Sequence, residues 1–257
     1  MKIGILGAMN EEVSRLKNDM EIEQVETRGM REYLLGKLYG HEVALVFSRW
    51  GKVAAASTAT TLIDRHKVDF LIFIGVAGAV DKGLNIGDVV ISDSLIQHDV
   101  DASSYPGIEK HEIPLLGVKE FKVSDKVVSM ATKAIDKFFS ENLNKEVFKN
   151  NLKKFGIAKP KVIKGIVASG DQFIASASQT DKLRKEIPGL KCVEMEGAAV
   201  AQVAYEHGTD FLIIRIISDK ADKNAVLDFK DFVKNIESHF TYGIVRYFLK
   251  GINGFAD

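Results

Sequence analysis

The side chains in this sequence that are best suited to chemistry are carboxylates at the ends of apolar runs. They are Glu11, Glu12, Glu194, Glu196 and Asp219. In an α/β sheet, ligands bind beyond the carboxyl ends of the strands, so acids at strand-to-helix junctions are placed to meet one. Carboxylates in such positions suit the hydroxyl groups of a sugar.

Each of these acids also has a structural explanation. Asn10 is expected to cap the helix that follows the first strand, and the helix dipole favours Glu11 and Glu12 in its first turn. Glu194 and Glu196 precede an alanine-rich helix and can likewise be acids of a helix start.

Arg215 is a charged residue inside an apolar strand and needs a partner. Alternation places Arg215, Ile217 and Asp219 on one face of that strand, with Asp219 at its carboxyl end. Two explanations are open for Arg215: it forms a structural ion pair, or it lies near a bound ligand.

Common metal, nucleotide and nucleophile motifs do not occur in the sequence. Gly4 and Gly7 lack the third glycine of a dinucleotide-binding loop, and there is no Walker loop or Gly-x-Ser-x-Gly elbow. The histidines form no His-Glu-x-x-His pattern, and Cys192 alone cannot make a CxxC zinc site. The chemistry is therefore expected to rest on carboxylates, without a metal or another cofactor.

The composition excludes several classes of partner. The 257 residues include 35 Lys and Arg and 35 Asp and Glu, so the formal net charge is zero, which argues against nucleic acid. The longest apolar run covers residues 70–80, short of the roughly 18 residues of a membrane span. With Cys192 as its one cysteine, the chain is expected in the reducing cytoplasm.

The elements that position these residues alternate along the chain and predict one α/β domain, residues 1–257, with a mixed, mostly parallel β-sheet flanked by helices. The predicted strands are Ile3–Ala8, Val43–Ser48, Phe70–Gly75, Val89–Ser92, Val162–Val167 and Phe211–Ser218. The predicted helices are Glu11–Lys17, Lys52–Arg65, Asp125–Phe139, Gln179–Glu186, Glu196–His207 and Phe229–Leu249, the last with Asp228 as its N-cap.

The junction motifs resemble those of the 5'-methylthioadenosine/S-adenosylhomocysteine nucleosidases, within the nucleoside phosphorylase superfamily. Their order makes the likeness specific, and they extend over nearly the whole chain. The motifs are Lys2-Ile3-Gly4-Ile5-Leu6-Gly7-Ala8-Met9 with Glu11-Glu12-Val13, Gly51-Lys52-Val53-Ala54-Ala55-Ala56, Gly75-Val76-Ala77-Gly78, Gly87-Asp88-Val89-Val90, Ser169-Gly170-Asp171 with Phe173-Ile174, Val193-Glu194-Met195-Glu196, and Ser218-Asp219 with Ala221-Asp222.

The resemblance implies a hydrolase that releases adenine from 5'-methylthioadenosine and S-adenosylhomocysteine. By this resemblance, Glu12 is the general base for water, Asp219 the general acid at adenine N7, and Glu196 the ligand of the ribose hydroxyls. An oxocarbenium-like transition state needs such groups. Asp219 must then hold a proton near pH 7 while Glu12 stays ionised.

The resemblance also implies the remaining substrate contacts. Phe173 stacks on adenine, the Ile174 backbone reads its edge, Met195 lies under the ribose, and Met9 and Phe229 line the pocket of the 5'-substituent. Further substrate contacts are expected at Val76, Val193, Glu194 and Ser218, with Arg215 behind them. A homodimer is implied, in which the loop near Tyr105 closes the partner's site.

Three features depart from the family pattern. The relatives usually have glycine and an aliphatic residue where this chain has Arg49 and Trp50, and often a hydroxyl residue in place of Val76. Residues 140–160 form an extra, lysine-rich segment, which is expected to be a solvated amphipathic helix. A guanidinium near the site keeps a purine nucleoside phosphorylase open as an alternative, and the lysines keep open a polyanion-binding protein on the same scaffold.

Overall fold

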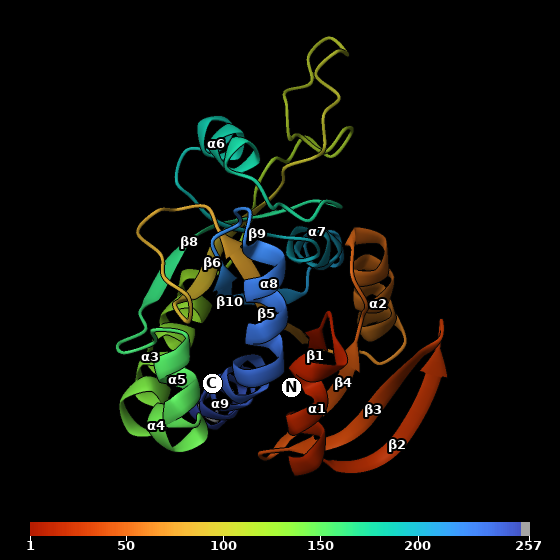
Figure 1. Ribbon diagram of the computed structural model, residues 1–257. Helices are drawn as coiled ribbons and strands as arrows, with labels where there is room; N and C mark the ends of the chain where they lie inside the picture. Colours follow the sequence, from red (N-terminus) through yellow and green to blue (C-terminus); the bar gives the residue numbers. More distant parts are fainter. Residues whose placement is uncertain (253–257) are drawn as a thin grey trace.

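Strands and helices alternate along the computed structural model, which describes residues 1–252 (Figure 1). The strands are β1 (Lys2–Gly7), β2 (Glu21–Arg28), β3 (Arg31–Leu38), β4 (His41–Phe47), β5 (Phe70–Ala79), β6 (Val89–Gln97), β7 (Phe121–Lys122), β8 (Val162–Ser169), β9 (Leu190–Glu194) and β10 (Asp210–Asp219). The helices are α1 (Asn10–Asp19), α2 (Lys52–Asp64), α3 (Asp125–Glu141), α4 (Leu143–Glu146), α5 (Lys149–Lys154), α6 (Ala177–Glu186), α7 (Gly197–His207), α8 (Ala225–Phe232), the π-helical η1 (Val233–Glu237) and α9 (Ser238–Gly251).

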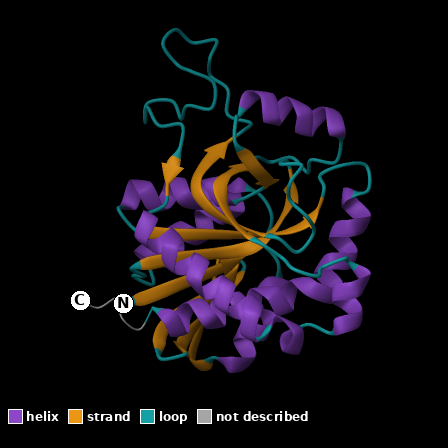
Figure 2. Ribbon diagram, turned by 90° about the vertical axis from the view of Figure 1, so that its left-hand side faces the viewer, coloured by secondary structure: helices purple, strands orange, loops and turns teal. Residues whose placement is uncertain are grey.

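The strands form one sheet that closes on itself over part of its width. The strand order is β10-β6-β8-β9-β5-β1-β4-β3-β2, and β10 also pairs with β5. The strands β5, β10, β6, β8 and β9 therefore make a closed ring, seen as strongly curved strands in Figure 2, from which β1, β4, β3 and β2 extend.

The sheet is mixed, as the sequence predicts, and it belongs to a single α/β domain. Parallel pairs are β1–β4, β1–β5, β5–β10, β6–β8 and β8–β9. Antiparallel pairs are β2–β3, β3–β4, β5–β9, β6–β7 and β6–β10. The antiparallel pairs thus lie in the N-terminal hairpins, at the short β7, and where the ring closes.

All six predicted strands are present, and the others escaped prediction for a physical reason. Strand β2 is exposed along almost its whole length, so it has no apolar run to mark it. Strand β9 is short, and its sequence Leu-Lys-Cys-Val-Glu includes two charged residues. A strand that is buried on both faces, such as β5, appears in the sequence as a long apolar run and is far easier to predict than an exposed or a short strand.

Two predicted helix starts are wrong. The C-terminal helix begins at Ala225 with Asn224 as its N-cap, so Asp228 lies inside α8, and the π-helical turn η1 interrupts the regular α-helix before α9. At the other end of the chain, Met9 is the N-cap of α1 and Asn10 is its first residue. The carboxylate of Glu12, three residues into the helix, accepts a hydrogen bond from the Met9 N–H there, as the acid of a capping box does.

Helices cover the sheet on both sides (Figure 2). Helix α2 packs against α7, while α1 and α3 both pack against α9. Helix α7 also packs on β6, β8 and β10 of the ring. Within residues 1–252, no helix has the length and apolar character needed to cross a bilayer.

The extra segment near residues 140–160 folds into two short helices, α4 and α5. Its lysines are exposed, as expected for a solvated face; they are Lys145, Lys149, Lys153, Lys154 and Lys159. Its apolar residues are buried; they are Leu143, Val147, Leu152 and Ile157. Glu146 pairs with Arg15 of α1 at 2.6 Å and Lys154 with Asp231 of α8 at 2.5 Å, so the segment is docked on helices that carry predicted site residues.

Candidate active site

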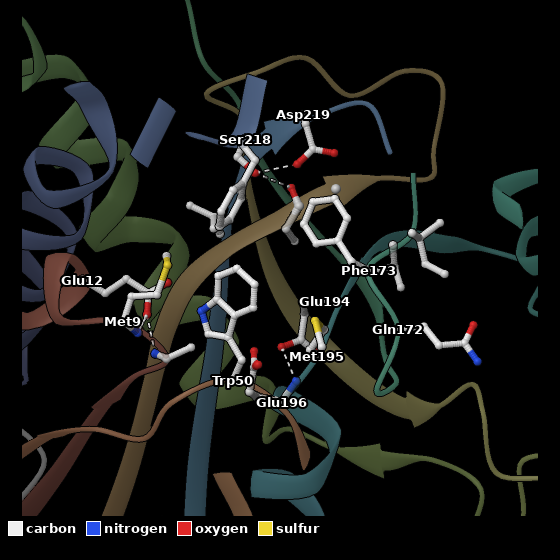
Figure 3. A pocket seen from close by; sticks show the side chains of 17 residues that line it. Met9, Glu12, Trp50, Gln172, Phe173, Glu194, Met195, Glu196, Ser218 and Asp219 are labelled. Carbon is white, nitrogen blue, oxygen red and sulfur yellow. Dashed lines mark hydrogen bonds between the residues drawn. The ribbon is translucent and has the colours of Figure 1, made fainter. Parts of the chain in front are cut away.

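One pocket brings together strand ends that are far apart in the sequence (Figure 3). It contains all of the predicted catalytic and substrate-contacting residues except Tyr105. Its lining consists of Ala8, Met9, Glu12, Trp50, Val76, Ala77, Gly78, Gln172, Phe173, Ile174, Val193, Glu194, Met195, Glu196, Ser218, Asp219 and Phe229. The strand-to-helix junctions singled out in the sequence therefore meet at one place.

Glu12 is buried in the first turn of α1, with 3% of its surface exposed. Its Oε2 accepts hydrogen bonds from the Met9 N–H at 2.9 Å and from the Ala8 N–H. Burial raises the pKa of Glu12 to about 7, against the lowering effect of the Met9 hydrogen bond and of the positive charge of Arg215. Glu12 is thus a base whose proton affinity matches neutral pH, rather than a fully ionised carboxylate as expected from the sequence.

Asp219 is the last residue of β10, where a bulge between Ile217 and Asp219 shifts the register against β5. Its two carboxyl oxygens accept hydrogen bonds from the Ser218 Oγ and the Ala221 N–H, each at 2.8 Å. Burial raises the pKa of Asp219 even so, and the negative charge of Asp228 adds to this effect. The surroundings therefore favour the protonated form that a general acid needs.

Two glycines of β5 make room for these two carboxyl groups. A Cβ at Gly75 would stand 2.5 Å from Glu12 Oε1, and a Cβ at Gly78 would stand 2.9 Å from Asp219 Oδ1. Both distances are too short for a real contact. The Gly75-Val76-Ala77-Gly78 motif thus lets one strand lie directly against the carboxyl groups of Glu12 and Asp219.

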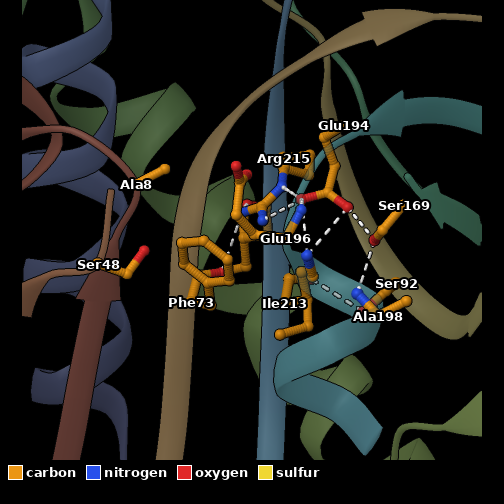
Figure 4. A network of polar contacts seen from close by, with 12 residues as sticks. Ala8, Ser48, Phe73, Ser92, Ser169, Glu194, Glu196, Ala198, Ile213 and Arg215 are labelled. Atoms are coloured by element: carbon orange, nitrogen blue, oxygen red, sulfur yellow. Dashed lines mark hydrogen bonds and ion pairs between the residues drawn. The ribbon is translucent and has the colours of Figure 1, made fainter. Parts of the chain in front are cut away.

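Glu194 forms the centre of a buried polar network behind the pocket (Figure 4). Its Oε2 accepts from Arg215 Nη2 at 2.6 Å, and its carboxylate also accepts from the Ser169 hydroxyl and the Gly197 N–H. The Arg215 guanidinium lies 4.1 Å from the centre of the Phe73 ring. Arg215 thus has the structural ion pair that the sequence left open, and the oxygens of Glu194 are engaged by donors of the protein itself.

Glu196 extends from the start of α7 into the pocket. Its backbone N–H donates to Glu194 Oε2 at 3.0 Å, and its Oε1 accepts from the Gly51 N–H at 2.7 Å. Burial and the negative charge of Glu194 raise the pKa of Glu196 to about 8. The network of Glu194 and Arg215 thereby fixes the backbone from which Glu196 projects.

The rest of the pocket wall is mostly apolar, with Gln172 and Ser218 as its other polar side chains. The Trp50 and Phe229 rings are 5.7 Å apart at 84°, and the Phe229 and Phe173 rings are 5.7 Å apart at 80°. Figure 3 shows Trp50 between Met9 on one side and Met195 on the other. The pocket therefore has carboxyl groups that suit the hydroxyl groups of a sugar, and aromatic side chains beside them.

Five lining residues were not among the predicted contacts. Ala8, Ala77, Gly78 and Gln172 lie inside the junction motifs, so their place near the site follows from the motifs although their individual roles do not. Trp50 stood out only as a departure from the family pattern, one residue before Gly51. Its contact with Phe229 joins segments about 180 residues apart, which no local pattern reveals.

Tyr105 is the one predicted contact that lies outside this pocket. It is 69% exposed, on the long loop between β6 and β7 that projects from the domain (Figure 1). The predicted role of Tyr105 concerns a second subunit, so the site of a single chain does not test it.

Comparison with known proteins gives the family. A model of the phosphorylase superfamily matches residues 2–250. The chain is 40% identical over 235 residues to the 5'-methylthioadenosine/S-adenosylhomocysteine nucleosidase of Listeria innocua, which covers 91% of this chain and 92% of the relative.

Solved structures agree in fold over nearly all of the chain. The nucleosidase of the same name from Neisseria meningitidis, in complex with methylthio-immucillin-A, has a TM-score of 0.85 at 31% identity, covering 97% of this chain and 98% of that one. The futalosine hydrolase of Helicobacter pylori has a TM-score of 0.80 at 29% identity, covering 97% of each chain. The chain therefore belongs to the phosphorylase superfamily and, within it, to the 5'-methylthioadenosine/S-adenosylhomocysteine nucleosidases, which are N-ribosyl hydrolases.

Proposed function

We propose that the protein hydrolyses the N-glycosidic bond of 5'-methylthioadenosine and S-adenosylhomocysteine, and also that of 5'-deoxyadenosine, to release adenine. The observation that carries this proposal is the placement of Glu12 and Asp219, two buried carboxyl groups with raised pKa values, on different sides of one pocket (Figure 3). A base for water and an acid for the leaving group are what this hydrolysis requires.

The proposed reaction moves two protons. Asp219 gives a proton to adenine N7 as the bond between C1' and N9 breaks, so that adenine leaves as a neutral base. Water adds to C1' and gives a proton to Glu12, which yields a free 5-substituted ribose. Glu196 accepts hydrogen bonds from the ribose hydroxyls, and these bonds strengthen as the sugar ring gains positive charge.

The charges of the pocket favour water over phosphate as the second substrate. The lining includes Glu12, Glu196 and Asp219 but no lysine or arginine among the described residues. Arg49, which kept the phosphorylase alternative open, donates through Nη2 to the Met30 carbonyl at 2.6 Å. A phosphate ion would meet the negative charge of Glu12 without a cation to hold it.

An adenine-release assay tests this proposal directly. The purified protein is given 5'-methylthioadenosine in buffers with and without phosphate, and the sugar product is identified. We expect adenine and free methylthioribose at the same rate in both buffers. Release that strictly requires phosphate and yields the ribose 1-phosphate would show a phosphorylase instead.

We further propose that the protein works as a homodimer in the cytoplasm. Exposed apolar side chains close in the sequence to pocket-lining residues support a covering partner; they are Val53, just after Trp50, and Val226 and Leu227, just before Phe229. A second copy that covers them would bring its own Tyr105 loop to the pocket. The reducing cytoplasm suits the single buried thiol of Cys192.

A further inference from the structure

Trp50 is part of the pocket wall but has no part in the proposed proton transfers. It lies in the loop between β4 and α2, and half of its surface is exposed. One edge-to-face contact joins it to Phe229, and a second joins Phe229 to Phe173. The exposed half of the indole is therefore available for contact with a molecule that occupies the pocket.

The loop that carries Trp50 is held on both sides. Before it, the Ser48 N–H donates to the Gly7 carbonyl at 2.7 Å. After it, the Gly51 N–H donates to Glu196 at 2.7 Å and the Lys52 N–H donates to Asp171 at 2.8 Å. Because its backbone is fixed in advance, the indole loses little conformational freedom when it meets a ligand.

The hydrogen bond of Gly51 also indicates which part of a bound nucleoside would lie next to the indole of Trp50. Gly51 binds the carboxylate of Glu196, which is the proposed ligand of the ribose hydroxyls. Trp50 is the next residue; its ring contacts Phe229, and Figure 3 shows the indole well away from Asp219, the proposed acid at adenine. The base and the 5'-carbon are attached to different ribose carbons, C1' and C4'. A nucleoside whose adenine lies at Asp219 therefore directs its 5'-substituent away from Asp219, toward the side of the pocket where Trp50 lies.

We propose that Trp50 is a specificity residue that stacks against the 5'-substituent and favours adenosines whose 5'-substituent is a flat aromatic group. This inference rests on the proposed function and deepens it, since it names the class of 5'-substituent that the site prefers. Stacking of two aromatic rings adds to the gain from burial alone. A 5'-phenylthio group would receive that gain, whereas 5'-deoxyadenosine has no substituent to stack.

The kinetic test compares two substrates in the same variant. We measure kcat/KM for 5'-phenylthioadenosine and 5'-deoxyadenosine and take the ratio of the two. In Trp50→Leu this ratio should fall by about fivefold to tenfold relative to the parent, and Trp50→Phe should restore most of it. Val25→Ala removes an exposed apolar side chain of β2, outside the pocket lining, and should leave the ratio unchanged.

An unchanged ratio in Trp50→Leu would overturn the inference, and so would an equal loss for both substrates, which is the pattern of a purely structural residue. A binding experiment separates this outcome from failure of the proposed function. Trp50 is the only tryptophan of the chain, so intrinsic fluorescence reports on it directly. We expect 5'-phenylthioadenosine to change this fluorescence more than 5'-deoxyadenosine does, even in a protein that released no adenine; equal changes would refute stacking.

Discussion

Glu12, Glu196 and Asp219 are all carboxyl groups, and all three have raised pKa values for the same first reason, which is burial. Their partners differ. Glu12 accepts two backbone hydrogen bonds and Glu196 accepts one. The charge of Arg215 opposes the rise in pKa of both, but Glu196 also faces the negative charge of Glu194. Environment, rather than residue type, divides the proposed roles of base, acid and sugar ligand among them.

The first prediction concerns the proposed acid. Asp219→Asn should lower the rate of adenine release by about 10²-fold or more, because an amide cannot deliver a proton to the leaving base. Binding of a non-hydrolysed substrate analogue should weaken far less. Asp210→Asn, an exposed acid at the other end of β10 and outside the pocket lining, is the matched control and should stay within a few-fold of the parent. Full activity in the Asp219 variant would assign the acid to another group.

The second prediction concerns the proposed base and its pH dependence. Glu12 acts only when ionised, so kcat/KM should fall as the pH is lowered through about 7, which is the pKa of the buried carboxyl group. Glu12→Gln should abolish most activity together with this limb of the profile. Glu11→Gln changes an exposed acid in the same turn and should keep the limb in place. An unshifted acid limb in an active Glu12 variant would contradict the assignment.

At the scale of the elements, strand β5 contacts both the proposed base and the proposed acid through its glycines. Gly75 lies against Glu12 and Gly78 against Asp219, so both carboxyl groups use the absence of a side chain on one strand. The position of the strand within the ring, between β9 and β10, holds both glycines in place. A substitution at either glycine of β5 should therefore lower the rate of adenine release.

The third prediction follows from this contact. Gly75→Ala should displace the Glu12 carboxylate and lower kcat by roughly 10- to 100-fold, because a misplacement of about 1 Å is enough for such a loss. Gly83→Ala, where the nearest side-chain atom would be 3.3 Å away, serves as the control. Circular dichroism on both variants separates misplacement from unfolding. Parental kcat in a folded Gly75→Ala would mean that Glu12 has room to adapt.

The fourth prediction concerns the extra segment, which should contribute more to stability than to catalysis. Leu152→Ala should lower the free energy of unfolding by about 2–5 kcal/mol, because Leu152 is 95% buried, with 5% of its surface exposed. Lys153→Ala on the exposed face should change it by about 0.5 kcal/mol or less. Urea denaturation measures both. We expect the folded Leu152 variant to keep releasing adenine; complete loss of activity would mean that the segment shapes the site.

The sequence predicted the buried parts of this architecture and missed the exposed ones. The ring strands β5 and β10 are buried along almost their whole length and appear in the sequence as long apolar runs, whereas the polar β2 gives no such run. The site was predictable because its residues stand in motifs at strand ends. The place of Trp50 in the pocket and the π-helical turn η1 could not be predicted, since each depends on tertiary packing that local spacing does not encode.

At the scale of the whole molecule, the pocket of one chain includes the proposed base, acid and sugar ligand but not Tyr105. The exposed side chains of Val53, Val226 and Leu227 belong to the surface on which the proposed dimer would form. A dimer would then complete each site with a loop from the other subunit.

The fifth prediction tests this exchange of loops. Light scattering should give twice the monomer mass of 28.4 kDa. Tyr105→Ala and Glu12→Gln should each be impaired alone, but their mixture, after subunit exchange, should regain activity. In the mixed dimer, one site has both an intact base and an intact partner loop. A mixture no more active than its components would place Tyr105 in its own subunit's site or in none.

The closure of the sheet also bears on how the protein opens and aggregates. Strand β10 pairs with β5 on one side and, at Ile214, Arg215 and Ile216, with β6 on the other, so the amides of these three residues should exchange with solvent only in rare, global opening events. Strand β2 stands at the free end of the strand order, exposed and rich in glutamate. Its amides should exchange first, and its charges should discourage pairing with the edge of another molecule, so the part of the sheet that frays soonest is the part least suited to start a fibril.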